Sequence, residues 1–174
     1  MENDFLKLIK SRRSCRHFKP EQVTDEELQA VLEAGTYAPS GHNLQNCFIV
    51  ALQQPEQMKQ LAELNARIWG ITSNPYYDAP TYVFVFAPGD SGNAFQDGSC
   101  ILENMMLAAH AIGLGSCWIN REKQMFDTEE GKVLMKEWGL PDGLIGIGAL
   151  ALGYPSREFR PAKPRKEGYY RIIK

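Results

Sequence analysis

Positive charge gathers near the start of this chain, although the protein as a whole is slightly acidic. Residues 5–20 contain six Lys or Arg side chains and no Asp or Glu, while the formal net charge of all 174 residues is −2. Three of these side chains, Arg12, Arg13 and Arg16, surround Ser14. Guanidinium groups bind phosphate oxygens in pairs, and a serine hydroxyl can donate to the same group. The stretch therefore indicates either an anion site or the solvated C-terminal end of a helix, where the dipole favours cations.

A second basic segment lies near the other end of the chain, in the sequence RPAKPRK at residues 160–166. Its Lys163 and Arg165 alternate with prolines that stiffen the backbone. Taken alone, such a segment is more often a solvated tail than a binding site. Spacing gives no reason to join it to the first cluster.

The loop PSGHNLQ, residues 39–45, is a candidate for contact with a flat ligand that has several heteroatoms. Ser40, Asn43 and Gln45 supply hydrogen-bond donors and acceptors, and Gly41 allows a ligand to approach the backbone closely. The alternative is ordinary turn chemistry, which explains the proline, serine and glycine. It explains less well why two amides stand directly before an apolar run.

The four cysteines are scattered without a CxxC pair, and the three histidines show no HxxxH spacing, so a zinc site is not indicated. Cys47 and Cys117 lie in apolar runs and are interpreted as small buried hydrophobic residues. Cys15 differs because three arginines flank it. We expect these arginines to lower its pKa and favour the thiolate.

Composition and missing motifs narrow the function. The length and the mix of apolar and charged residues predict one globular domain. A charge of −2 argues against a general nucleic-acid or membrane binder, and no signal peptide is recognised, so the cytoplasm is the expected compartment. The chain has no GxSxG, HExxH, P-loop or GxGxxG set. If the protein is an enzyme, we expect a bound cofactor to carry the chemistry.

Apolar periodicity and capping signals predict alternating helices and strands. Thr24 and Glu27 form a capping box for a helix that Gly35 can close, and DTEE at residues 127–130 offers a second capping box. The aromatic stretch from residue 69 to residue 80 is interpreted as a loop. Helices are predicted over residues 2–11, 24–35, 55–68, 95–112 and 127–138, and strands over residues 47–52, 81–87, 144–152 and 168–173. Residues 115–120 are interpreted as a short strand or a turn. This order favours an α/β or α+β sandwich around one central sheet.

Several motifs, in this order, resemble the nitroreductase family of FMN-dependent oxidoreductases. They span nearly the whole chain, at about the spacing of that family. The matching stretches are RRSCRHF (12–18), AGTYAPSGHNLQ (34–45), ENMMLAAHAIGLGSCWI (103–119), ALGYP (151–155) and KPRK (163–166).

The resemblance implies a fold, an assembly and a cofactor. The fold is α+β, a three-layer sandwich with a central mixed or antiparallel sheet flanked by helices. Residues 1–174 form one FMN-binding domain, which works as an intertwined homodimer and holds FMN non-covalently. The resemblance also implies that Ser40 and Gln45 can reach the flavin of the partner subunit. The residues implied to bind the cofactor are Arg12, Arg13, Ser14, Arg16, Pro39, Ser40, Asn43, Gln45, Gly115, Ser116, Cys117, Lys163 and Arg165.

The function predicted on this basis is transfer of reducing equivalents from NADH or NADPH to electron-poor acceptors such as nitroaromatics and quinones. The mechanism is a ping-pong hydride transfer that needs no side-chain nucleophile. The alternative is a non-enzymatic nucleotide-binding or redox-sensing protein, in which the basic clusters hold a phosphate and Cys15 titrates.

Overall fold

A four-stranded antiparallel sheet lies at the centre of the computed structural model, which describes residues 1–174. Its strands are β1 (Phe48–Leu52), β2 (Thr81–Pro88), β3 (Gly115–Ile119) and β4 (Leu144–Gly153). Their order across the sheet is β1-β2-β4-β3. The two edges of the sheet are therefore β1 and β3.

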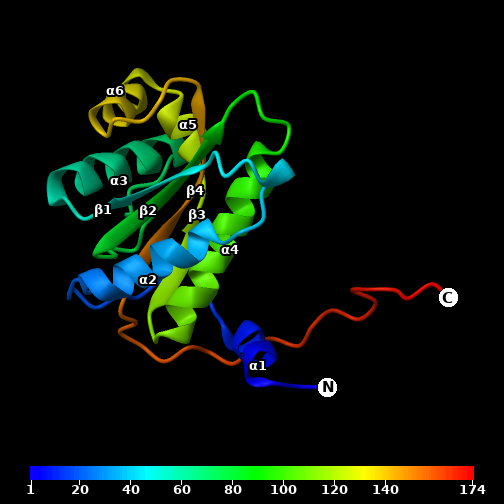
Figure 1. Ribbon diagram of the computed structural model, residues 1–174. Coiled ribbons are helices and arrows are strands. Elements are labelled where there is room, and N and C mark those ends of the chain that lie inside the picture. The colour runs from blue at the N-terminus through cyan, green and yellow to red at the C-terminus, as the bar shows by residue number, and fades with distance from the viewer.

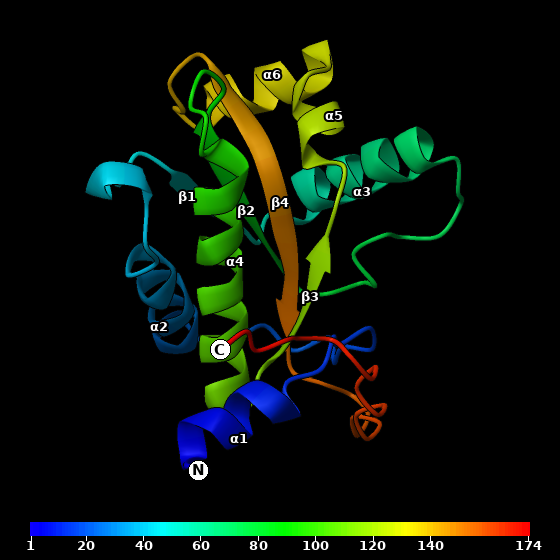
Figure 2. The same cartoon turned by 90° about the vertical axis from the view of Figure 1, so that its right-hand side faces the viewer.

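Helices cover both faces of this sheet (Figures 1 and 2). On one face lie α2 (Asp25–Thr36) and α4 (Ala94–Ala111), and on the other lie α3 (Pro55–Trp69), α5 (Glu122–Phe126) and α6 (Glu129–Glu137). The first helix, α1 (Asp4–Ser11), lies beside the C-terminal end of α4. The predicted three-layer α+β sandwich is confirmed, with a sheet that is wholly antiparallel. None of the helices is both long and apolar enough to cross a membrane.

The position of the central strand β2 explains why its sequence is a continuous apolar run. Phe84 and Phe86 belong to the core beneath α3, α5 and α6, whereas Val83 and Val85 belong to the core beneath α2 and α4. All four side chains are 0% exposed. Because successive strand residues point to opposite faces and helices cover both faces, alternation with polar residues is lost.

The capping box predicted for α2 is present. Thr24 Oγ1 accepts a hydrogen bond from Glu27 N at 3.2 Å, and Glu27 Oε2 accepts one from Thr24 N at 2.9 Å. The prediction that Gly35 closes this helix is wrong, because α2 continues to Thr36. Gly35 instead packs against α4, where an added Cβ would lie 2.8 Å from Met105 Cγ.

The second predicted capping box is only partly present. Thr128, not the preceding aspartate, is the N-cap of α6, and its Oγ1 accepts a hydrogen bond from Gly131 N at 3.0 Å. A glycine at this position has no side chain that could complete the reciprocal bond. The short helix α5, directly before it, was not predicted.

The C-terminal segment does not form the strand predicted at 168–173. Residues after Pro155 have no regular secondary structure, and Tyr169 and Ile172 are 81% and 72% exposed. The first part of this segment, which contains Arg157 and Phe159, runs along the body of the molecule, and the red C-terminal part extends away from it (Figure 1). A strand needs a neighbouring strand to accept its backbone hydrogen bonds, and within one chain this segment meets none.

Candidate functional site

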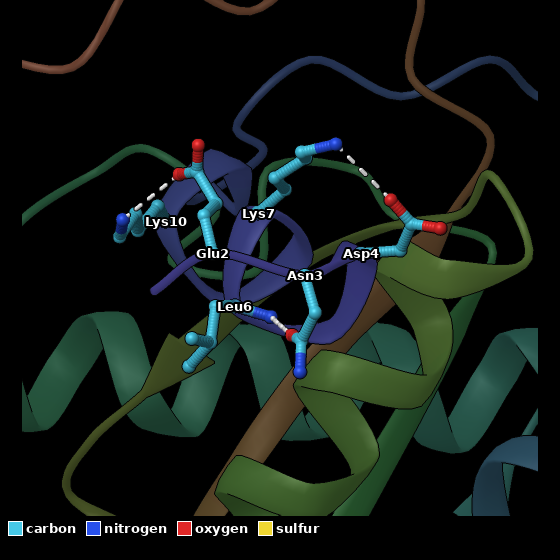
Figure 3. A network of polar contacts seen from close by, with 6 residues as sticks. All are labelled: Glu2, Asn3, Asp4, Leu6, Lys7 and Lys10. Atoms are coloured by element: carbon cyan, nitrogen blue, oxygen red, sulfur yellow. Dashed lines mark hydrogen bonds and ion pairs between the residues drawn. The ribbon is translucent and has the colours of Figure 1, made fainter.

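The lysines and the arginines near the N-terminus have different partners. Lys7 Nζ lies 3.2 Å from Asp4 Oδ1, and Lys10 Nζ lies 3.0 Å from Glu2 Oε1 (Figure 3). The ion pairs belong to α1, whose first turn is capped by Asn3. These lysines therefore already have acidic partners.

The three arginines form no ion pair with any acid of the chain. Arg13 Nη1 donates to the carbonyls of Lys10 and Arg12, at 2.8 and 2.6 Å. Two further guanidinium nitrogens, Arg12 Nη1 and Arg13 Nε, are buried without a partner. Buried donors almost always have acceptors in folded proteins, so this cluster has unused capacity to bind an anion.

Arg16 points to a different neighbour. Its Nε donates to the hydroxyl of Tyr77 at 3.2 Å, and its guanidinium carbon lies 5.7 Å from the centre of the Tyr77 ring. No local sequence pattern predicts this contact, because the two residues are far apart in the chain. Tyr77 has φ +58°, which places a non-glycine residue in the left-handed region.

The arginine stretch runs beside the edge strand β3. Cys15 N donates to Ser116 O at 2.9 Å, and Ser14 forms a parallel bridge with Ser116. Gly115 is required at this approach, since an added Cβ would lie 2.7 Å from Cys15 Sγ. The fold thus brings the predicted site residues Gly115, Ser116 and Cys117 to the arginine cluster.

The expectation that the flanking arginines lower the pKa of Cys15 is wrong. The residue is 3% exposed, and burial raises the pKa of its thiol more than a backbone hydrogen bond at His17 lowers it. Sγ also donates to His17 O at 3.3 Å, a bond that only the protonated thiol can make. Burial also raises the pKa of Cys117, although the nearby Arg16 opposes that shift. At Cys117, the loss of water from around a thiolate therefore costs more than the nearby Arg16 restores.

The two basic segments, from opposite ends of the chain, line one cavity of about 580 Å³, which we call the basic groove. Its volume lies in the range of pockets that hold small ligands and cofactors, roughly 300–1,000 Å³. The groove includes Arg157 and His17, which sequence reasoning did not single out. Its lining residues are Arg13, Ser14, Cys15, Arg16, His17, Arg157, Glu158, Phe159, Arg160, Pro161, Lys163 and Arg165.

The polar loop of residues 39–45 lies elsewhere. It contains a short 3-10 helix, Gly41–Asn43, and the backbone N–H of Gly41 contacts Asp97 in the first turn of α4. At the other end of α4, His110 Nε2 lies 2.7 Å from Ser11 Oγ, beside the arginines. Asp97 and His110 are about 20 Å apart along the helix axis at 1.5 Å per residue. Figure 1 shows the loop and α1 at opposite ends of α4.

One chain therefore brings together only part of the predicted site. Five predicted residues line the basic groove: Arg13, Ser14, Arg16, Lys163 and Arg165. Arg12 is adjacent in sequence but does not line the groove, and the buried residues 115–117 of β3 lie behind it, beside Ser14. The predicted residues of the polar loop do not reach it: Pro39, Ser40, Asn43 and Gln45.

Comparison with known proteins gives one consistent result. Residues 9–154 match the model of the nitroreductase family. A relative from Archaeoglobus fulgidus, which carries the provisional name NADH dehydrogenase/NAD(P)H nitroreductase, is 32% identical over 161 residues, covering 88% of this chain and 86% of its own. The FMN reductase (NADPH) of Bacillus subtilis is 23% identical, covering 97% of this chain and 73% of its own.

Solved structures agree with the sequence relatives. A nitroreductase with bound FMN from Bacteroides fragilis superposes with a TM-score of 0.90 at 33% identity, covering 99% of this chain and 100% of its own. A second nitroreductase with bound FMN, from Desulfitobacterium hafniense, has a TM-score of 0.87 at 28% identity, covering 99% of this chain and 100% of its own. The likeness thus extends over the whole fold.

Proposed function

This chain belongs to the nitroreductase family, and we propose that it is an FMN-dependent oxidoreductase that uses NADH or NADPH as reductant. The observation that carries the proposal is the basic groove, where arginines without acidic partners meet cations from the C-terminal segment. FMN offers such a groove a phosphate dianion. Residues 1–174 would form one FMN-binding domain, working in the cytoplasm, where its reductant is available.

The residues present fit FMN. Arg12 and Arg13 have buried guanidinium nitrogens that still lack acceptors, and phosphate oxygens are acceptors that guanidinium groups bind well. Ser14, Lys163 and Arg165 lie at the same groove and add a hydroxyl and two cations. We assign these five residues to the phosphate.

The other predicted residues would lie beside the rest of the cofactor. Arg16 is turned toward Tyr77 rather than toward an acid, and it is available for the polar edge of a flavin. Gly115, Ser116 and Cys117 form the strand that runs beside Ser14. Both buried thiols of this region have raised pKa values, so neither supplies a thiolate near neutral pH, and the thiol-sensor alternative finds no support.

When bound, FMN would accept a hydride from the nicotinamide and pass reducing equivalents to an electron-poor acceptor such as a nitroaromatic or a quinone. The protein's part is to bind and orient flat ligands and to hold positive charge near the cofactor. We propose that the nicotinamide leaves before the acceptor binds, which is a ping-pong sequence. No side chain is required as a nucleophile, and protons can come from solvent.

We further propose that the active form is a homodimer whose sites are shared between copies. The loop that carries Pro39, Ser40, Asn43 and Gln45 contacts the start of α4, whereas the arginine cluster lies beside its end, about 20 Å away along the helix axis at 1.5 Å per residue. α1 is amphipathic but buries none of its residues, and Phe5 and Ile9 are 62% and 41% exposed. A second copy, packed against this surface in the opposite direction, would cover the apolar residues and bring its loop to the groove.

The test is spectroscopic. The purified protein, saturated with added FMN, is mixed without oxygen with NADH and, separately, with NADPH. We expect the visible flavin absorbance to disappear with at least one of the two, and to return when a quinone or nitroaromatic is added. Parallel lines in double-reciprocal plots would support the ping-pong sequence. A protein that neither carries nor takes up FMN would contradict the proposed function.

A further inference from the structure

Asp97 is a buried carboxylate whose hydrogen-bond partner belongs to a distant loop. It stands in the first turn of α4 and is 8% exposed. Both of its carboxylate oxygens lie 3.1 Å from the backbone nitrogen of Gly41. It forms no ion pair with any Lys, Arg or His of the chain. Burying a carboxylate is costly unless hydrogen bonds compensate, and the positive end of a helix offsets part of that cost.

The loop that Asp97 contacts has a strained backbone. His42, Asn43 and Gln45 have φ values of 53°, 55° and 50°, so three non-glycine residues lie in the left-handed region within four positions. Such conformations persist only when surrounding contacts enforce them, and they gather at functional sites. The loop also sits tightly against the start of α4, since a Cβ at Gly41 would lie 2.4 Å from Asn93 Nδ2.

Contacts within the loop do not by themselves attach it to the body of the protein. Ser40 Oγ accepts a hydrogen bond from Gln45 N at 3.1 Å, and Asn43 Oδ1 accepts one from the Gln45 side chain at 2.9 Å. These bonds close the loop on itself. The bond from Gly41 N to Asp97 is the one that ties this small unit to a rigid helix.

We propose that Asp97 is a positioning residue, which holds the loop of residues 39–45 in the strained conformation that the flavin site requires. The inference rests on the proposed function, because the loop carries Ser40, Asn43 and Gln45. Asp97 itself would not contact the cofactor. It acts through the backbone of Gly41, whose location fixes where the neighbouring hydroxyl and amide groups are presented.

The same helix offers a matched control. Asn104 Nδ2 donates to Ala34 O at 3.2 Å and thereby ties α4 to α2. Asn104→Leu removes a polar contact of α4 without touching the loop. Asp97→Leu removes the acceptor for Gly41, Asp97→Ala removes it with less bulk, and Asp97→Asn retains one acceptor oxygen. The four variants therefore separate loss of the loop contact from general damage to α4.

Two quantities are measured on each variant. The first is the exchange rate of the Gly41 amide hydrogen in the flavin-free protein, followed by NMR. The second is the dissociation constant for FMN, from the quenching of flavin fluorescence. A hydrogen bond to a charged group stabilises a conformation more than a neutral one does. We therefore expect Asp97→Leu and Asp97→Ala to weaken FMN binding about tenfold or more and to accelerate Gly41 exchange by a similar factor.

Asp97→Asn should retain most of the FMN affinity and most of the protection of the Gly41 amide. Asn104→Leu should keep the FMN dissociation constant and the Gly41 exchange rate within about twofold of the wild type, while lowering the melting temperature. The inference is overturned if the Leu and Ala variants at position 97 match Asn104→Leu in FMN affinity and in Gly41 exchange. Failure of the proposed function looks different, because then the wild type and Asn104→Leu would bind no FMN either.

Discussion

At the scale of single residues, the arginines near the N-terminus differ from the neighbouring lysines in what they contact. Lys7 and Lys10 are paired with acids at the start of α1. The arginines instead contact backbone carbonyls or a tyrosine hydroxyl, and two of their buried nitrogens have no acceptor. Charge alone could not separate these groups. Their contacts identify the arginines as the cations available for a ligand.

The first prediction follows from this difference. Arg16→Ala should weaken FMN binding about tenfold or more, because it removes a charge-assisted donor from the groove. Lys10→Ala is the matched control, since it removes a cation from the same stretch whose charge is already paired with Glu2. The measurement is a titration of the flavin-free protein with FMN, followed by fluorescence. Equal affinities for the two variants would refute the assignment of Arg16.

At the scale of secondary-structure elements, α5 begins with the most deeply buried acid of the chain. Glu122 is 1% exposed, and Tyr76 donates a hydrogen bond to its Oε1 at 3.2 Å, while its Oε2 has no partner. Burial raises the pKa of Glu122 to about 8, against the opposing effects of Tyr76 and Arg121. Asn65 of α3 also donates to Tyr76, at 3.3 Å, so this polar group joins α3 to α5.

The second prediction concerns stability and pH. Because the folded pKa of Glu122 lies above its ordinary value of 4.5, the folded protein binds this proton more tightly than the unfolded chain does. The free energy of unfolding should therefore decrease as the pH rises from 4.5 to about 8. Glu122→Gln cannot ionise and keeps an acceptor for Tyr76. Its stability relative to the wild type should increase with pH across that window and then level off.

Urea denaturation at a series of pH values, followed by tryptophan fluorescence, measures this difference. The control is Glu129→Gln in α6, where an exposed carboxyl has a pKa lowered by its hydrogen bond to Lys132. The stability of this variant relative to the wild type should not increase as the pH rises. If wild type and Glu122→Gln lose stability in parallel from pH 5 to about 8, the buried acid does not titrate in the predicted way.

At the scale of the whole molecule, the predicted cofactor residues are separated into two groups by the length of α4. One group surrounds the basic groove near the end of α4, and the other is the loop at its start. If the active protein is a homodimer, each site takes its groove from one copy and its loop from the other. A chain damaged only in the groove and a chain damaged only in the loop should then complement each other in a heterodimer.

The third prediction is complementation between two inactive variants. Arg16→Ala damages the groove, and Asn43→Ala damages the loop, so each homodimer should bind FMN poorly. Co-expressed with different affinity tags, the two chains should form heterodimers in which one site has both an intact groove and an intact loop. We expect about one FMN per heterodimer, measured by absorbance after tandem purification.

The controls for complementation are the two homodimers, purified in the same way. A site contained within one chain would leave both sites of the heterodimer damaged. In that case, FMN content no higher than in the parent variants would contradict the shared site. A monomer in sedimentation experiments would contradict the homodimer itself.

The local elements of this protein are determined by sequence over short distances. The capping box at Thr24 and Glu27, the apolar period of α4 and the unbroken run of β2 each depend on neighbouring residues, and all are present. The motifs shared with the nitroreductase family also follow the sequence in order. A predicted helix end was wrong where tertiary packing decides the role of the residue. Gly35 was expected to end α2 but lies inside it, because close packing on α4 leaves no room for a side chain there.

Tertiary structure decided which residues are buried and which residues distant in sequence lie close together. It buried Cys15, so desolvation raised the thiol pKa that the flanking arginines were expected to lower. It joined Lys163 and Arg165 to an arginine cluster about 150 positions earlier, and it placed the loop anchored by Asp97 at the far end of α4. Burial, pairing of distant charges and separation across the molecule depend on how the layers pack, and no local pattern contains that information.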